Sequence, residues 1–200
     1  MFKYFAAAFL TGAACAMPAR ATDFVDQSDP VANAFMAGFS QGGLAQSFAP
    51  SGSNVSGAGL FLVSGVGTTD TVTISLWTDL PNQFGATLLA SASTMGSVGS
   101  WADVFWAPVS VAANQTYFLV FSGNNTLGAA GDTQNNYVFG NTYANSSFDS
   151  YPGYDYTFRT YSSDAVSPSP EPASWALMVG GFGMVGGALR SRRKTSLSFG

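Results

Sequence analysis

The sequence predicts an all-β protein whose domain is an antiparallel β-sandwich of seven to eight short strands. Between Gln46 and Tyr161 the apolar segments are short, several alternate with the two-residue period of strands, and no helical period stands out. Gly, Pro and Asn separate these segments, as they do at turns between short strands. Two further segments are expected outside the sandwich: an N-terminal signal peptide and a single C-terminal hydrophobic helix.

Residues 1–21 have the composition of a secretory signal peptide. Lys3 supplies a positive charge, residues 4–16 are mostly apolar, and residues 19–21 match an A-x-A cleavage site. The Sec translocon would therefore export the chain, with cleavage after Ala21. Cys15 leaves open a lipid-anchored mature N terminus, although Gly12 stands where such a signal usually has Leu.

Residues 22–44 are interpreted as a partly ordered lead-in to the domain. They contain three Asp residues, Pro30 and a Gly-rich stretch, and the segment Phe35–Phe39 has the pattern of a short edge strand. The domain itself is expected to cover residues 45–161. A polar, Pro-containing linker then covers residues 162–169.

Within the domain, each apolar segment between turn signals predicts a strand. Val72, Ile74 and Leu76 alternate with polar residues, so we expect them to face the core. Pro108 interrupts one segment and favours an edge strand or a bulge, whereas residues 115–121 are apolar on both faces and predict a central strand. The expected strand segments are 60–63, 71–77, 86–91, 102–105, 109–111, 115–121, 137–139 and 154–161.

The C-terminal segment combines an acid between prolines, an apolar stretch and a basic cluster. Residues 173–189 carry no charge over 17 residues, which is the short end of what crosses a bilayer as a helix. The basic cluster at 190–194 would stay on the cytoplasmic side, so the domain would be placed outside. The Gly-rich composition favours close contact with another membrane protein. Residues 195–200 form a tail.

Eleven residues of this segment form a motif. They are Pro170, Glu171, Pro172, Trp175, Gly181, Phe182, Gly183, Arg190, Arg192, Arg193 and Lys194. In order and spacing the motif resembles a PEP-CTERM sorting signal. The resemblance implies recognition of residues 170–194 by an exosortase, a membrane transpeptidase, and cleavage near the Pro-Glu-Pro. It also implies a Gram-negative host that makes exopolysaccharide or biofilm, an inner-membrane intermediate, and delivery to the cell surface or extracellular matrix. An ordinary C-terminal anchor is the alternative.

The exported body is acidic and lacks the side chains of many catalytic sites. Residues 22–172 contain eleven acidic residues and one basic residue, Arg159, for a formal charge of −10, and no His, Lys or Cys. This charge excludes nucleic acid as a partner. The missing His and Cys exclude the usual zinc and copper ligands and the Ser-His-Asp and Cys-His systems. No Asp lies in a motif that fixes a carboxylate pair, so we expect no enzyme and no resident cofactor.

Five segments of the body share a second pattern. They are residues 45–48, 71–77, 87–91, 115–117 and 156–161. Together they resemble a jelly-roll module of the choice-of-anchor type, which is similar to galactose-binding-like domains. The resemblance implies a jelly-roll-like sandwich and leaves the ligand open, because this architecture hosts binders, spacers and accessory modules.

Carbohydrate binding is the alternative function. Exposed aromatic rings beside Asn, Asp and Gln side chains offer stacking surfaces and hydrogen bonds to sugars, although any single ring in a strand is more often core. The candidate ligand-binding residues are Trp101, Asp103, Trp106, Tyr151 and Tyr154. Arg159, as the one basic side chain of the body, is expected to pair with an Asp.

Calcium is a less specific expectation. Several acidic and amide side chains in or beside loops offer the hard oxygen ligands that Ca²⁺ prefers, although no Asp-x-Asp-x-Asp loop is present. These residues also have a simpler role in keeping an exported protein soluble. They are Asp132, Asn135, Asn136, Asp149 and Asp155.

Overall fold

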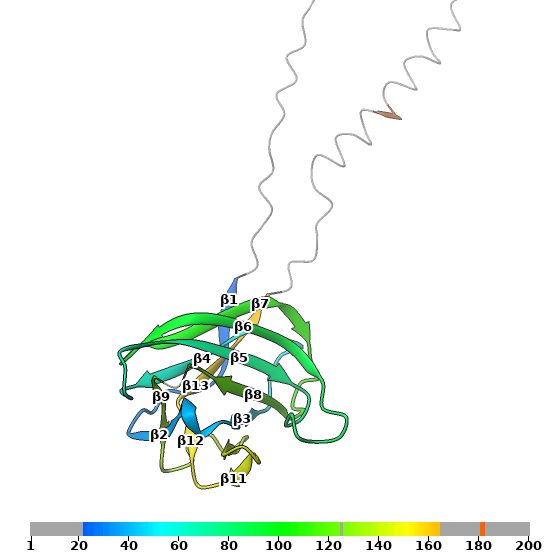
Figure 1. The fold of residues 1–200 in the computed structure, drawn as a ribbon. Coiled ribbons are helices and arrows are strands. Elements are labelled where there is room, and N and C mark those ends of the chain that lie inside the picture. Colours follow the sequence, from blue (N-terminus) through cyan, green and yellow to red (C-terminus); the bar gives the residue numbers. More distant parts are fainter. Residues whose placement is uncertain (1–21, 125, 165–180, 183–200) are drawn as a thin grey trace, which may run out of the picture. The chain divides into compact units, whose positions relative to one another are not determined.

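Two antiparallel sheets pack face to face in the computed structural model, which describes residues 22–124, 126–164 and 181–182 (Figure 1). The predicted all-β sandwich is therefore confirmed. The folded unit runs from Thr22 to Asp164. The expected signal peptide and nearly all of the sorting segment lie outside the described residues.

The larger sheet has seven strands and is built around β4. Strand β4 pairs with β7 along most of its length and with β13 over residues 57–60, and its last two residues pair with β9. Strand β1 pairs with β13 and forms one end of the sheet, while β2 and β12 pair with β9. The strands are β1 (Asp23–Asp29), β2 (Ala34–Gly38), β4 (Asn54–Val63), β7 (Trp101–Ser110), β9 (Gly128–Asp132), β12 (Asp155–Tyr156) and β13 (Phe158–Ser163).

The smaller sheet has six strands in the order β11-β10-β3-β8-β5-β6. Strands β5 and β6 form a long hairpin, and a short 3₁₀ turn, η1 (Phe39–Gln41), leads from β2 of the larger sheet into β3 of this one. The strands are β3 (Leu44–Phe48), β5 (Thr69–Trp77), β6 (Leu88–Ser97), β8 (Tyr117–Ser122), β10 (Thr142–Ala144) and β11 (Asp149–Tyr151).

The main core contains the side chains that the strand period predicted. Val72, Ile74 and Leu76 of β5 are fully buried, and they belong to one cluster with Leu60 and Leu119. The residues of β8 that alternate with Leu119 belong to a second, smaller cluster around Phe118, Ala45 and Leu80. Strand β8 therefore buries both faces between β3 and β5, which confirms the expected central strand.

The number and limits of the strands differ from the expectation. The described residues contain thirteen strands, so the count of seven to eight was wrong. The segment 137–139 is not a strand: Tyr137 is buried, while Val138 and Phe139 are largely exposed. The segments 102–105 and 109–111 join in β7, and the register shift opposite Val55–Gly57 confirms the expected bulge at Pro108.

Residues 22–44 contribute two strands to the sandwich, more than the expected lead-in. Strand β2 corresponds to the short strand expected at Phe35–Phe39, and it pairs with β9. Strand β1 was not expected, because its polar, Asp-rich sequence has no strand period. Those Asp residues hold neighbouring segments: Asp23 accepts a hydrogen bond from Ser56 Oγ at 2.6 Å, and Asp26 accepts one from the Ser51 N–H at 3.1 Å.

The closing segment 154–161 is broken at Thr157 into β12 and β13. Strand β12 pairs with β9, whereas β13 lies between β1 and β4. Because the segment changes partners, Asp155 and Thr157 are as buried as Tyr156 and Phe158, which the period had placed on the opposite face. Strand β13 also continues to Ser163, so the folded unit includes the start of the expected linker.

Two residues of the sorting segment are described. Gly181 and Phe182 are helical, within the stretch expected to form a hydrophobic helix. The rest of that stretch lies outside the described residues. In the part of the chain that the structure describes, no helix reaches the length and apolarity needed to cross a bilayer.

Candidate functional site

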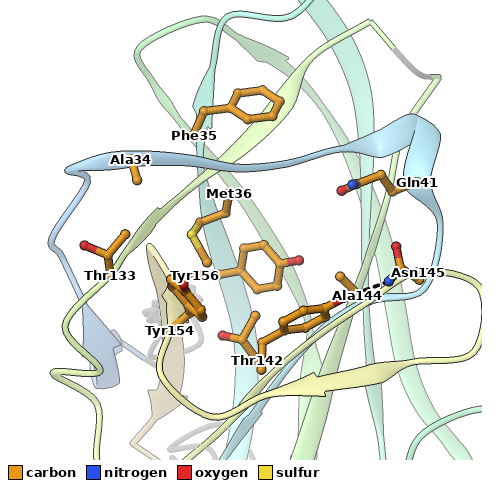
Figure 2. A pocket seen from close by; sticks show the side chains of 11 residues that line it. Ala34, Phe35, Met36, Gln41, Thr133, Thr142, Ala144, Asn145, Tyr154 and Tyr156 are labelled. Carbon is orange, nitrogen blue, oxygen red and sulfur yellow. Dashed lines mark hydrogen bonds between the residues drawn. The ribbon is translucent and has the colours of Figure 1, made fainter.

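A cavity of about 330 Å³ opens where β2, β10, β11 and β12 come together (Figure 2). Its lining combines aromatic rings, one thioether, amides and hydroxyl groups. The side chains come from two regions that are far apart in the sequence, residues 34–41 and residues 133–156. The lining residues are Ala34, Phe35, Met36, Gln41, Thr133, Thr142, Ala144, Asn145, Tyr151, Tyr154 and Tyr156.

Tyr156 is the rigid part of the cavity. Its side chain is 1 % exposed, its ring meets Phe121 edge-on at a centroid distance of 5.5 Å, and its hydroxyl donates to the Tyr143 carbonyl at 3.1 Å. Burial raises the pKa of Tyr156 above its usual value, so the hydroxyl stays protonated. Met36 of β2 lies beside this ring in Figure 2. The wall is therefore apolar and fixed before any ligand enters.

Tyr151 and Tyr154 are the accessible tyrosine rings of the cavity. They are 37 % and 41 % exposed. Asn145, whose φ of 66° is left-handed, donates from Nδ2 to the Tyr151 hydroxyl at 2.8 Å and to Asp149 Oδ2 at 3.1 Å. Asn tolerates this backbone conformation better than most residues. Two exposed rings, one of them positioned by an amide, suit a ligand that stacks and also accepts or donates hydrogen bonds.

A second group of functional side chains lies on the face of the larger sheet that is turned away from the core. Arg159 of β13 pairs with Asp103 of β7, donating from both Nε (2.8 Å to Oδ1) and Nη2, which confirms the expected Arg–Asp pair. The Tyr161 hydroxyl also donates to Asp103 Oδ1 at 2.9 Å. The Arg159 guanidinium lies over the Trp101 ring, 4.1 Å from its centroid. We call these four residues the arginine cluster.

The charge of Arg159 is compensated inside the arginine cluster. Burial alone would lower the pKa of Arg159, but the hydrogen bond and charge of Asp103 outweigh it and raise that pKa. Burial, followed by the hydrogen bond to Asp103, raises the pKa of Tyr161 to about 12. The guanidinium is thus engaged by a carboxylate and by a ring, while Trp101 is partly exposed and the neighbouring Phe105 is exposed.

The five residues proposed for ligand binding lie in three places. Trp101 and Asp103 belong to the arginine cluster, and Tyr151 and Tyr154 line the cavity. Trp106 packs against the main core, and its Nε1 donates to the Val55 carbonyl at 3.0 Å. The structure therefore does not bring the five candidates into one site.

The contribution of β2 and η1 to the cavity was not predicted from the sequence. Phe35, Met36 and Gln41 line it, but they lie in the segment that was expected to be a lead-in. Phe35 is 57 % exposed. The Phe-Met pair in β2 was the available signal, yet nothing local in the sequence connects it to tyrosines more than a hundred positions away.

Neither the family models nor the curated proteins gave a match to this chain, and no solved structure matched it either.

Proposed function

We propose that this chain is an exported, non-catalytic protein with a jelly-roll-like sandwich, sorted by an exosortase to the cell surface or extracellular matrix, where it associates with exopolysaccharide. The observation that carries the proposal is the motif at residues 170–194, which begins shortly after the folded unit ends at Asp164. Because the motif follows the folded unit, its removal would leave the sandwich intact.

The distribution of charge supports this proposal. Of the seven basic residues in the chain, Arg159 is the one inside the unit Thr22–Asp164, and Asp103 pairs with it. The same unit contains ten Asp residues. An acidic surface keeps an exported protein soluble and gives it no attraction to anionic lipid. The remaining basic residues belong to the two terminal addresses.

The proposal is tested by measuring in which cell fraction of its own host the chain is found. With residues 170–172 replaced by Ala, the chain is expected to stay in the inner-membrane fraction, whereas the wild type reaches the outer surface or the medium. The matched control is Pro168→Ala, which changes a nearby proline outside the motif. Surface delivery of the triple variant at the wild-type level would refute sorting through this motif.

A second candidate function is carbohydrate binding at the cavity. The specific observation is the pair of accessible rings, Tyr151 and Tyr154, beside the Asn145 amide in a cavity of about 330 Å³. A sugar ring stacks on tyrosine and uses amide and hydroxyl groups for its own hydroxyls. The exopolysaccharide of the host is the ligand class that the sorting proposal implies.

Affinity precipitation with purified host exopolysaccharide tests this second function. Tyr154→Ala is expected to reduce retention at least about fivefold, since one lost stacking contact is worth about 1–3 kcal/mol. Phe84→Ala, which removes a fully exposed ring outside the cavity, is the control. If Trp101→Ala abolishes retention and Tyr154→Ala does not, the arginine cluster and not the cavity is the binding site.

A further inference from the structure

Three buried carboxylates lie close together where β1 ends and β9 meets β12. Asp132 and Asp155 are directly opposite each other in the β9–β12 pair and are 0 % exposed, and Asp29 at the end of β1 is 2 % exposed. Burial raises the pKa of Asp29; the Val31 N–H opposes this, and the charges of Asp132 and Asp155 raise it further. The three carboxylates therefore lie within electrostatic reach of one another.

No side chain of the folded unit neutralises these carboxylates. Arg159 is the one basic residue between Thr22 and Asp164, and it is engaged by Asp103 in the arginine cluster. Buried charges are found in proteins when they are paired, hydrogen-bonded or bound to a metal ion. Because no basic side chain pairs with these three carboxylates, hydrogen bonds or a bound metal ion must compensate their charge.

Hydrogen bonds satisfy two of the three carboxylates. Asp155 accepts from Gln46 Nε2 at 2.9 Å and from the Tyr137 N–H at 3.0 Å. Asp132 accepts from the Gln134 N–H at 3.2 Å, from Asn33 Nδ2 at 2.6 Å and from Asn136 Nδ2. The loops 30–33 and 133–136 therefore both close around the Asp132 carboxylate.

In the third carboxylate, that of Asp29, only one of the two oxygens accepts a hydrogen bond. Asp29 Oδ1 accepts from the Val31 N–H at 3.0 Å, but Asp29 Oδ2 is buried without any hydrogen-bond partner. Asn135 Oδ1, on the loop that follows Asp132, is likewise buried and unpartnered, and Asn135 has a left-handed φ of 49°. Such orphaned oxygens are rare in folded proteins and call for a bound ion or an equivalent donor.

We propose that Asp29, Asp132 and Asn135 bind a divalent cation of the size of Ca²⁺ between the β1–β2 loop and the loop that follows β9. The cation supplies the positive charge that this part of the fold lacks and a partner for Asp29 Oδ2 and Asn135 Oδ1. It also joins two loops that are about a hundred positions apart in the sequence.

Oxygen chemistry favours Ca²⁺ over other metals. The unit has no His or Cys, so softer metals have no preferred ligand, and Ca²⁺ accepts carboxylate, amide and main-chain oxygens in flexible geometry. Among the described residues no three acidic side chains already stand as a metal-binding group. The cation therefore takes two carboxylates and completes its shell with the Asn135 amide, main-chain oxygens and water. Of the calcium ligands expected from the sequence, Asp149 lies elsewhere, on the exposed strand β11.

The proposed cation site borders the tyrosine-lined cavity. Ala34 and Thr133, which line the cavity, directly follow Asn33 and Asp132. A cation that fixes both loops would thus also fix this side of the cavity, whether or not the cavity binds a sugar. The cation site stands independently of the proposed function.

Thermal unfolding of the full chain in detergent, with CaCl₂ added after EGTA treatment, tests the proposal. A saturable rise of the unfolding temperature is expected, on the order of 5–10 °C when Ca²⁺ is about a hundredfold above its dissociation constant. Isothermal titration with CaCl₂ is expected to give one site per chain. No rise with Ca²⁺, together with no heat of binding, overturns the proposal.

Variants distinguish a bound cation from a proton as the group that compensates the Asp29 charge. Asp29→Asn is expected to abolish the Ca²⁺ response while unfolding in EGTA at a temperature no lower than wild type, because it removes an uncompensated charge. Asp132→Asn serves the same purpose if Asp29→Asn fails to fold. The matched control is Asp164→Asn, an exposed carboxylate of the same unit, which keeps the response. A Ca²⁺ response that persists in Asp29→Asn and Asp132→Asn places the cation elsewhere and also overturns the proposal.

Discussion

At the residue scale, two glycines of β4 determine how the outer face of the larger sheet is assembled. Gly59 stands between Asp103 and Arg159 in the strand register, and Gly57 stands between Phe105 and Tyr161. Because neither glycine has a side chain, the side chains of β7 and β13 meet above β4. The centroids of the Phe105 and Tyr161 rings are 4.8 Å apart as a result.

This arrangement predicts that Gly59→Ala destabilises the fold. A Cβ at Gly59 would lie 2.2 Å from Asp103 Oδ1 and 3.1 Å from Arg159 Cγ, so the ion pair must move. We expect a loss of about 1–3 kcal/mol in the free energy of unfolding, measured by urea denaturation. Gly153→Ala, with no atom within 4 Å of the new Cβ, is the control and should change stability by less than about 0.5 kcal/mol.

A double variant shows whether the ion pair is the cause. In the Asp103→Ala background the added methyl group has lost its closest neighbour, so Gly59→Ala should cost less there than in the wild type. Equal costs in the two backgrounds would mean that the glycine is required for another reason. The sequence predicted that Arg159 pairs with an Asp, but not with which one, because Asp103 is 56 positions away and only the double pairing of β4 brings the two together.

At the scale of elements, periodicity located the strands that cross the core and missed others, such as β9, for a physical reason. Strands β4, β5 and β8 alternate or are wholly apolar because they cross a core, and that pattern is visible in the sequence. Strand β9 consists of Gly, Ala and Asp and shows no such pattern. Its glycines are needed because Phe35 and Met36 of β2 lie within 2.4 Å and 2.0 Å of where a Cβ would be at Gly128 and Gly131.

Asp70, near the start of β5, fixes the connection between β8 and β9. Its carboxylate accepts hydrogen bonds from the N–H groups of Asn124 (2.6 Å), Thr126 (2.9 Å) and Leu127 (3.2 Å). Burial raises the pKa of Asp70, but these hydrogen bonds together outweigh burial and hold the pKa below its usual value. The sequence identified Asp70 only as an acid beside a strand, since its three donors follow more than fifty positions later.

This tether predicts an acid-dependent loss of stability. A carboxylate with a lowered folded-state pKa stabilises the fold above the unfolded-state pKa of about 3.9, and this contribution is lost as the pH falls through the folded-state value. Asp70→Asn should therefore cost about 1–3 kcal/mol at pH 7, and the difference from wild type should shrink as the pH falls below about 4. Chemical denaturation across pH measures this. A difference that stays constant with pH, or that equals the effect of the exposed control Asp164→Asn, would contradict the tether.

At the scale of the whole molecule, acidic and basic residues lie in different parts of the chain. The sandwich is acidic and has one engaged arginine, while the basic residues cluster in the two terminal segments. The sequence was sufficient to predict the sandwich class and to suggest the sorting address, since both depend on local patterns. It could not predict the cavity or the buried carboxylate group, because each is assembled from β1–β2, β9 and the last strands, and only tertiary pairing brings these together.

The proposed sorting by an exosortase requires that the C-terminal segment is removed from the mature protein. The intact mass of the protein recovered from the surface or medium of its host measures this most directly. The account predicts a chain that begins at Thr22 and ends near Pro170–Pro172, with the full C terminus kept in a host that lacks its exosortase. A mature chain from the wild-type host that retains Arg190–Gly200 would contradict the account.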